Sequence, residues 1–161
     1  MPDAARSAVP SSPNGNASPD RKASTARATP ALRRARTCYD HLAGVLGVAV
    51  TEALVSQQAL IPGEDGFGLG PHADAVFAAL EVDLAEQLHR RASRPLLRSC
   101  LDWTERRPHL AGRLGASLAG TMLENGWLVR NSSGRSVAIT DPGRQHLQRA
   151  LGLSFDNVPL V

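Results

Sequence analysis

The chain has 161 residues, of which 42% are hydrophobic and 20% charged, and its formal net charge is +3. This length allows one domain with a hydrophobic core, and no stretch is apolar for long enough to cross a membrane. Two cysteines, Cys38 and Cys100, are too few for a disulfide scaffold and are not spaced as CxxC. We therefore expect a cytoplasmic protein with free thiols and no membrane partner.

Basic and acidic residues occupy different parts of the chain. Residues 1–37 carry seven Lys or Arg against two acids, residues 38–87 carry eight acids and no Lys or Arg, and residues 88–135 carry nine Arg against three acids. Two interpretations follow: the acidic and basic segments pack against each other, which we favour, or the Arg-rich segment faces phosphate.

Residues 1–29 hold four of the eleven prolines and almost no large apolar side chain. Such a segment buries too little surface to offset its ordering entropy, so we predict a disordered basic Pro/Ser/Ala-rich tail. Residues 30–161 are then expected to form a single domain.

Helical spacing of apolar residues predicts a long helix over residues 30–60, followed by a turn at 62–66 and a helix from about residue 71. Residues 96–103 suit a short strand or an extended connector. A second long helix is predicted from residue 104 or 107 to about 125. Strands at 127–130 and 135–140 flank a four-residue hairpin turn, and a last helix covers residues 142–151.

One heptapeptide occurs twice, as HLAGVLG at residues 41–47 and as HLAGRLG at residues 109–115. Other apolar positions also agree when the chain is shifted by 68 residues, so we interpret residues 38–84 and 106–155 as two repeats. Two such units are expected to pack together about a pseudo-twofold axis. The predicted fold class is mainly α with small β-hairpins, built as a winged-helix-like duplicated unit, because helix, hairpin and helix form the back half of a winged helix.

The strings CYDHLAG at residues 38–44 and CLDWTERRPHLAG at residues 100–112, with Gly126 and Trp127 before the hairpin, carry a family resemblance. Over residues 30 to about 155 the chain resembles the C-terminal part of a subgroup of bacterial ArsR-type winged-helix transcriptional regulators. The resemblance implies a homodimer that binds double-stranded DNA through an N-terminal winged helix, a domain that we do not expect in this chain. We therefore expect an ArsR-type regulator or its regulatory half; the alternative is an effector-sensing or dimerisation module without independent DNA binding.

Two sets of candidate site residues follow. For DNA contact they are the arginines around the second repeat and its hairpin: Arg106, Arg107, Arg113, Arg130 and Arg135. Regulators of this type often sense metals or thiol-reactive species, which directs attention to Cys38, Asp40, His41, Cys100, Asp102 and His109. Of these, Cys38, His41 and Cys100 are the candidate sensor. Cys38 and His41 share a face of the predicted helix and suit a soft metal ion such as zinc, with Cys100 as a third ligand. The alternative, which we favour, is a buried cysteine and a hydrogen-bonded histidine in each repeat, and no cofactor is certain.

Sequence motifs for catalysis are missing. The chain contains no nucleophile elbow, P-loop, dinucleotide fingerprint or HExxH. We therefore predict that the protein is not an enzyme.

Overall fold

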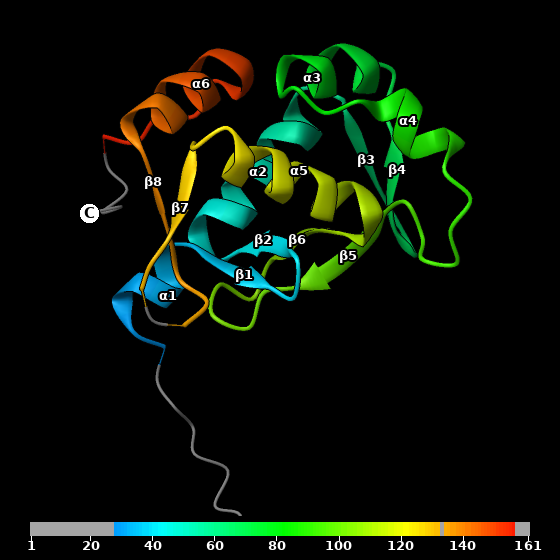
Figure 1. Ribbon diagram of the computed structural model, residues 1–161. Coiled ribbons are helices and arrows are strands. Elements are labelled where there is room, and N and C mark those ends of the chain that lie inside the picture. Colours follow the sequence, from blue (N-terminus) through cyan, green and yellow to red (C-terminus); the bar gives the residue numbers. More distant parts are fainter. Residues whose placement is uncertain (1–27, 133, 157–161) are drawn as a thin grey trace, which may run out of the picture.

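The computed structural model describes residues 28–132 and 134–156, which form six helices and eight strands (Figure 1). In chain order the elements are α1 (Pro30–Arg34), β1 (Arg36–Cys38), β2 (His41–Ala43), α2 (Gly44–Ser56), β3 (Leu60–Gly63), β4 (Gly66–Leu69), α3 (Ala73–Ala79), α4 (Leu84–His89), β5 (Arg98–Leu101), β6 (Pro108–Ala111), α5 (Gly112–Glu124), β7 (Leu128–Arg130), β8 (Val137–Ile139) and α6 (Asp141–Leu151). The strands form four separate antiparallel two-stranded sheets, in which β1 pairs with β2, β3 with β4, β5 with β6 and β7 with β8. The predicted tail at residues 1–29 lies almost wholly outside the described residues.

The predicted winged-helix-like duplicated unit is wrong. In a winged helix the helix before the hairpin is preceded by a partner helix of a helix-turn-helix. Here α2 and α5 each follow a β-hairpin directly, so the order is hairpin, helix, hairpin and helix. Four small antiparallel sheets stand among the helices, so the predicted pseudo-twofold arrangement of two winged-helix units is wrong as well.

The long helices predicted at residues 30–60 and 104–125 are shorter than expected. The first is interrupted by β1 and β2, whose tight turn places Tyr39 in the left-handed region at φ 58°. The second begins only at Gly112, after β5 and β6. Buried Ala35 and Leu42 fitted a helical spacing, but an extended strand and the end of α1 bury them equally well.

The other predicted helices and strands are present, with their ends shifted by one or two residues. Residues 62–66 lie in the β3–β4 hairpin, residues 98–101 form a strand, and β7 and β8 pair from Leu128 opposite Ile139. The final helix, α6, begins after Thr140, whose side chain accepts a hydrogen bond from the Gly143 amide.

Glycine explains why the HLAG string recurs. Gly44 and Gly112 stand at the first position of α2 and α5 with φ of +79° and +83°, where the strand turns into the helix. A Cβ atom at Gly44 would come within 2.6 Å of the Arg33 carbonyl oxygen, and one at Gly112 within 2.7 Å of the Leu96 carbonyl oxygen. Positive φ and close backbone approach both require glycine at these two positions.

The two hairpins that carry HLAG pack crosswise. Strand β2 lies against α5, β6 lies against α2, and β2 and β6 also contact each other (Figure 1). One continuous core runs between the elements and includes the fully buried Leu54, Phe77 and Leu114. The crosswise packing brings residues near 40 and residues near 105 into one buried region. In the described residues, no helix has the length and apolar character needed to cross a bilayer.

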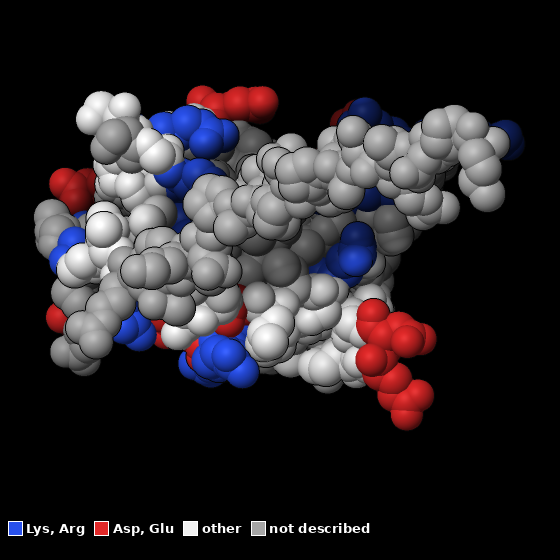
Figure 2. All heavy atoms as spheres, turned by 90° about the horizontal axis from the view of Figure 1, so that it is seen from below, with Lys and Arg blue, Asp and Glu red and all other residues white. Residues whose placement is uncertain are grey.

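Ion pairs join the acidic and basic segments. Arg94 after α4 binds Asp40 in the β1–β2 turn, and Arg107 binds Glu52 on α2. On the face seen in Figure 2, the visible Lys and Arg side chains lie in several separate patches. These contacts support the interpretation that the two segments pack through complementary charge.

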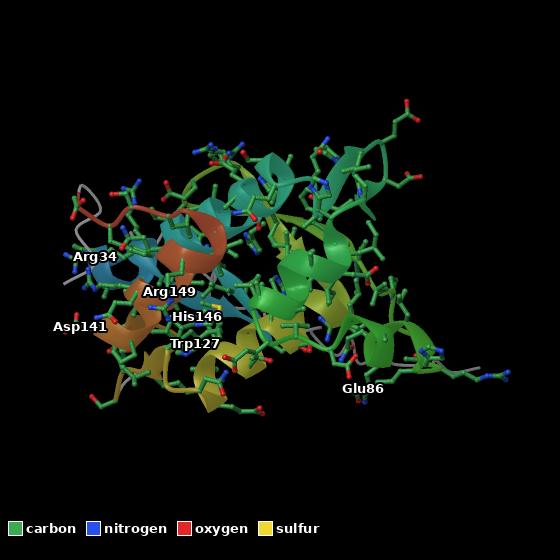
Figure 3. All side chains as sticks on the ribbon, turned by 90° about the horizontal axis from the view of Figure 1, so that it is seen from above. Arg34, Glu86, Trp127, Asp141, His146 and Arg149 are labelled. Atoms are coloured by element: carbon green, nitrogen blue, oxygen red, sulfur yellow. The ribbon has the colours of Figure 1, made fainter. Side chains whose placement is uncertain are left out.

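Trp127 belongs to the core beside α6. Its side chain is buried, and its ring stacks on His146 with centroids 3.6 Å apart and planes 21° apart (Figure 3). His146 also hydrogen-bonds the Ala79 carbonyl oxygen through Nε2, at 2.9 Å. Trp127 therefore anchors α6 under the β7–β8 hairpin.

Candidate functional site

Two cysteines and two histidines meet where the β1–β2 and β5–β6 hairpins face each other. Cys38 stands opposite His41 in the register of the first hairpin, and Cys100 stands opposite His109 in the second. Directly opposed residues of an antiparallel pair project to the same face of the sheet. One potential ligand atom from each of the four side chains lies within 4.8 Å of the other three.

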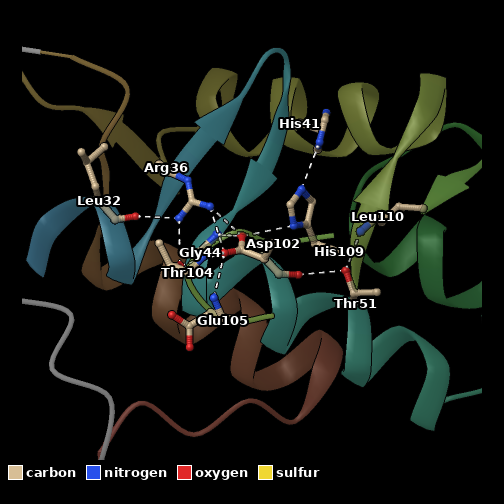
Figure 4. A network of polar contacts seen from close by, with 11 residues as sticks. Leu32, Arg36, His41, Gly44, Thr51, Asp102, Thr104, Glu105, His109 and Leu110 are labelled. Atoms are coloured by element: carbon tan, nitrogen blue, oxygen red, sulfur yellow. Dashed lines mark hydrogen bonds and ion pairs between the residues drawn. The ribbon is translucent and has the colours of Figure 1, made fainter. Parts of the chain in front are cut away.

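The two histidines face each other through the same ring atom. His41 Nε2 and His109 Nε2 are 3.1 Å apart, and both side chains are buried (Figure 4). On the far side of each ring lies a carboxylate: Asp102 Oδ2 is 3.2 Å from His109 Nδ1, and Asp40 Oδ1 is 3.6 Å from His41 Nδ1. Neither Nδ1 makes a well-aligned hydrogen bond within the described residues. The Nε2 atoms therefore point into the cluster and the Nδ1 atoms point towards acids.

Asp102 is held by a dense set of donors (Figure 4). Arg36 donates from Nη2 to both carboxylate oxygens at 2.9 Å, and the Gly44 amide donates to Oδ2 at 2.7 Å. The amides of Thr104 and Glu105 and the Thr104 hydroxyl donate to Oδ1. Burial raises the pKa of Asp102, but the hydrogen bonds from Gly44 and Arg36 outweigh it and hold the pKa well below its usual range.

Arg36 carries this network to the first helix. Its side chain is 1% exposed, and Nη1 donates to the Leu32 carbonyl oxygen at 3.0 Å and to the Thr104 hydroxyl at 3.3 Å. Arg36 and Asp102 are 66 residues apart in the chain. One buried ion pair therefore fastens the loop between β5 and β6 to β1 and to the start of α2.

Both cysteines are half-buried, and Cys100 borders a surface pocket. Both are free thiols. Burial raises the pKa of the Cys100 thiol, and the neighbouring Cys38 raises it further. A pocket of about 430 Å³ beside the cluster is lined by residues that include Tyr39, His41 and Cys100. An ion or a small reagent entering this pocket reaches the cluster directly.

Burial disfavours the charged form of both histidines. Desolvation first, and then the charge of His41, lower the pKa of His109 to about 4. Desolvation also lowers the pKa of His41, against the opposing effect of Asp40. Both imidazoles are therefore neutral at pH 7 in the folded protein.

This predicts a loss of stability on mild acidification. An unfolded histidine takes up a proton near pH 6.5, whereas folded His109 takes it up only near pH 4. Between these values the unfolded state binds more protons than the folded state. The free energy of unfolding should therefore decrease as the pH is lowered, by up to about 1.4 kcal/mol per pH unit. Urea denaturation at pH 7 and pH 5 in the presence of a chelator measures the fall. His109→Gln should reduce it, and an equal pH dependence in the variant would contradict the assignment.

The structure brings together the three predicted sensor residues, Cys38, His41 and Cys100, and adds His109 as a fourth. The expected helix face for Cys38 and His41 is wrong, because the two are cross-strand partners in a hairpin. His109 had a signal in the sequence, since the shift of 68 residues that defines the repeat aligns it with His41. Arg36 had none, because it is one of seven basic residues among residues 1–37.

The five predicted DNA-contact arginines come from three places in the fold: the loop between β5 and β6, the start of α5 and the β7–β8 hairpin. Arg113 donates to the carbonyl oxygens of Arg94 and Gln87, and Arg107 binds Glu52. The others are exposed: Arg106 is in the loop between β5 and β6, and Arg130 and Arg135 are at the β7–β8 hairpin.

Comparisons with known proteins yield one informative similarity. No protein-family model matches the chain, and no solved structure matches it. The chain is 38% identical over 124 residues to an uncharacterized HTH-type transcriptional regulator of Bacillus subtilis (strain 168), YdfF. The match covers 77% of this chain and 54% of that protein, so the chain spans about half the length of its curated relative. This similarity supports a transcription-regulator family for the chain.

Proposed function

We propose that the chain acts in transcriptional regulation as an ArsR-type regulator or as the regulatory half of one, in the cytoplasm and as a homodimer. The observation that carries the proposal is the 38% identity to an HTH-type transcriptional regulator over 77% of the chain. The similar segment amounts to 54% of that protein, which suits a part that works beside a further domain. No catalytic role is included in the proposal.

Effector sensing is assigned to the cluster of Cys38, His41, Cys100 and His109. A regulator needs a site whose chemical state changes the packing of the protein. The cluster joins two hairpins, each of which packs on a helix of the opposite half. A metal ion or a thiol-reactive compound bound there would change how the hairpins meet.

Direct DNA contact, where the chain makes it, is assigned first to Arg130 and Arg135. Both are exposed on the β7–β8 hairpin, and neither has a carboxylate partner within residues 28–132 and 134–156. Arg106 is exposed as well. Arg107 and Arg113 are already engaged by Glu52 and by backbone carbonyl groups, which makes them weaker candidates.

The test is a gel shift of the DNA upstream of the protein's own coding sequence at two salt concentrations. Contact with phosphates predicts retention that weakens as salt rises, with a slope of about −0.9 per contact in a plot of log K against log salt. Replacing Arg130 and Arg135 with alanine should remove two contacts and lower the slope by about 2.

The matched control replaces Arg90 and Arg91, which are exposed after α4, and removes the same charge. Equal losses in both double variants would reject the hairpin as the contact surface. If the wild type retains no DNA at low salt, the alternative holds, in which the chain is an effector-sensing or dimerisation module. A reporter gene that responds neither to deletion nor to overexpression of the protein would reject the regulatory role itself.

A further inference from the structure

We propose that Cys38, His41, Cys100 and His109 form a closed tetrahedral site for a soft divalent transition metal, with Zn²⁺ as its natural occupant. The role of the ion as the effector rests on the proposed regulatory function. The binding of the ion rests on the geometry of the four side chains alone and is measured without DNA.

The donor set suits zinc in kind. Two thiolates and two imidazoles make an S₂N₂ set, which is typical of tetrahedral zinc sites. The four donors leave no position for water or substrate, as in structural and regulatory zinc sites rather than catalytic ones. Each hairpin supplies one cysteine and one histidine in direct register, so each acts as one half of the site.

The distances suit zinc in size. Zn–N bonds of about 2.0–2.1 Å and Zn–S bonds of about 2.3 Å at tetrahedral angles place the ligand atoms roughly 3.3–3.8 Å apart. The two Nε2 atoms are 3.1 Å apart, and one ligand atom from each of the four residues lies within 4.8 Å of the rest. The two histidines would move apart by a few tenths of an ångström around an ion, and the other donor atoms, which lie within 4.8 Å of one another, would close by up to about 1 Å.

The two aspartates complete the arrangement. Metal-binding histidines usually donate their other N–H to a carboxylate, which fixes the ring and its tautomer. Asp102 Oδ2 and Asp40 Oδ1 stand 3.2 Å and 3.6 Å from the Nδ1 atoms of His109 and His41. Asp102 is fixed by Arg36 and Gly44, and Asp40 by Arg94, so both acceptors are held in place.

An ion would also satisfy all the ring nitrogens of His41 and His109, which their own hydrogens cannot do. Two neutral imidazoles carry two N–H hydrogens, whereas the contact between the Nε2 atoms and the two contacts to aspartates together require three. Without an ion, the two Nε2 lone pairs face each other at 3.1 Å, or one Nδ1 lone pair faces a carboxylate, or the pair takes up a third proton in a buried place. An ion bound to both Nε2 atoms leaves both hydrogens on Nδ1, where the aspartates accept them.

The experiment is a titration of the metal-free wild-type protein with Co²⁺, which reports its own geometry. Binding should saturate at one equivalent, with intense tetrahedral bands in the red and thiolate-to-cobalt charge transfer in the near ultraviolet, and Zn²⁺ should displace the signal. A hundredfold excess of Zn²⁺ over its Kd should raise Tm by roughly 5–10 °C, because the ion binds the folded protein.

Variants assign the ligands. Cys38→Ser and Cys100→Ser should each lower the charge-transfer intensity by about half, since each removes one of the two thiolates. Asp40→Asn, at a half-exposed position outside the ligand set, should weaken Zn²⁺ binding by about 10–100-fold while the cobalt spectrum keeps its tetrahedral form. Ser99→Ala, next to Cys100 and without a ligand atom, is the matched control and should bind as the wild type does.

Two results would overturn the inference. One is a weak octahedral cobalt spectrum that the cysteine variants do not change. The other is a wild type that binds no Co²⁺ or Zn²⁺ but whose thiols are joined rapidly by a disulfide-forming oxidant, which would make Cys38 and Cys100 a redox pair. Metal binding without any effect on DNA retention would leave the site intact and remove only the regulatory role.

Discussion

Replacing Arg36 with methionine should lower the free energy of unfolding by about 3–5 kcal/mol. The substitution keeps much of the side-chain volume but removes the partner of a carboxylate that is 0% exposed. The cost is large because Asp102 would stay buried without its counter-charge, and because Arg36 also donates to the Leu32 carbonyl oxygen and the Thr104 hydroxyl. Urea denaturation followed by circular dichroism measures the loss.

Arg33→Met is the matched control for Arg36→Met. Arg33 lies three residues earlier, its side chain is 58% exposed, and its contact with Glu105 is 3.9 Å long. Exposed pairs of this kind contribute about 0–1 kcal/mol. Where Arg36→Met fails to fold, Arg36→Lys keeps the charge, loses the paired hydrogen bonds and should cost less. Equal losses for Arg33→Met and Arg36→Met would show that the buried pair has no special weight.

The Arg36–Asp102 pair should also make the folded protein less stable at low pH. The pKa of Asp102 is lower in the folded protein than in the unfolded chain, where a carboxyl group titrates near pH 3.9. Its contribution to stability is therefore complete above that value and is lost as pH falls through the folded pKa. In Arg36→Met this contribution is smaller, so the unfolding free energy should depend less steeply on pH in that range.

What the sequence predicts well are local features with local causes. The β7–β8 hairpin and α6 carry their own signals: a polar turn, alternating apolar residues, and a Thr cap followed by proline. The exact repeat of HLAG reports a backbone need, since Gly44 and Gly112 both adopt positive φ where strand becomes helix. These features follow from neighbours within a few residues.

What it does not predict depends on partners far away in the chain. The β1–β2 turn contains no glycine, asparagine or proline that would predict a turn at this place, and Tyr39 adopts φ 58° there. Its strands are kept in place by the crosswise packing of β2 on α5 and by the contact of Arg36 with Asp102. Sequence spacing alone therefore favoured a continuous helix. The cluster was predicted with three members although the repeat aligns His109 with His41, because the position of His109 beside the other three depends on the pairing of β5 with β6.

Leu54→Ala should lower the free energy of unfolding by about 2–5 kcal/mol, the range found for truncated core leucines. Leu54 lies on α2, is 0% exposed and belongs to the continuous core. Leu88→Ala is the matched control: Leu88 is on α4 and 51% exposed, so its loss should stay within about 0.5 kcal/mol. Leu54→Met, which conserves volume, should cost less than about 1.5 kcal/mol.

The position of the tryptophans makes Leu54→Ala a test of the whole arrangement. The chain has two, Trp103 and Trp127, both in the second half, whereas Leu54 is in the first. If the halves share one core, the fluorescence transition of Leu54→Ala in urea should shift to lower concentration together with the loss of helix seen by circular dichroism. Helix loss that moves while the tryptophan transition stays in place would mean that the halves unfold separately. In that case the crosswise packing of β2 on α5 and β6 on α2 would not couple them, and a ligand at the hairpin junction would have no rigid path to either helix.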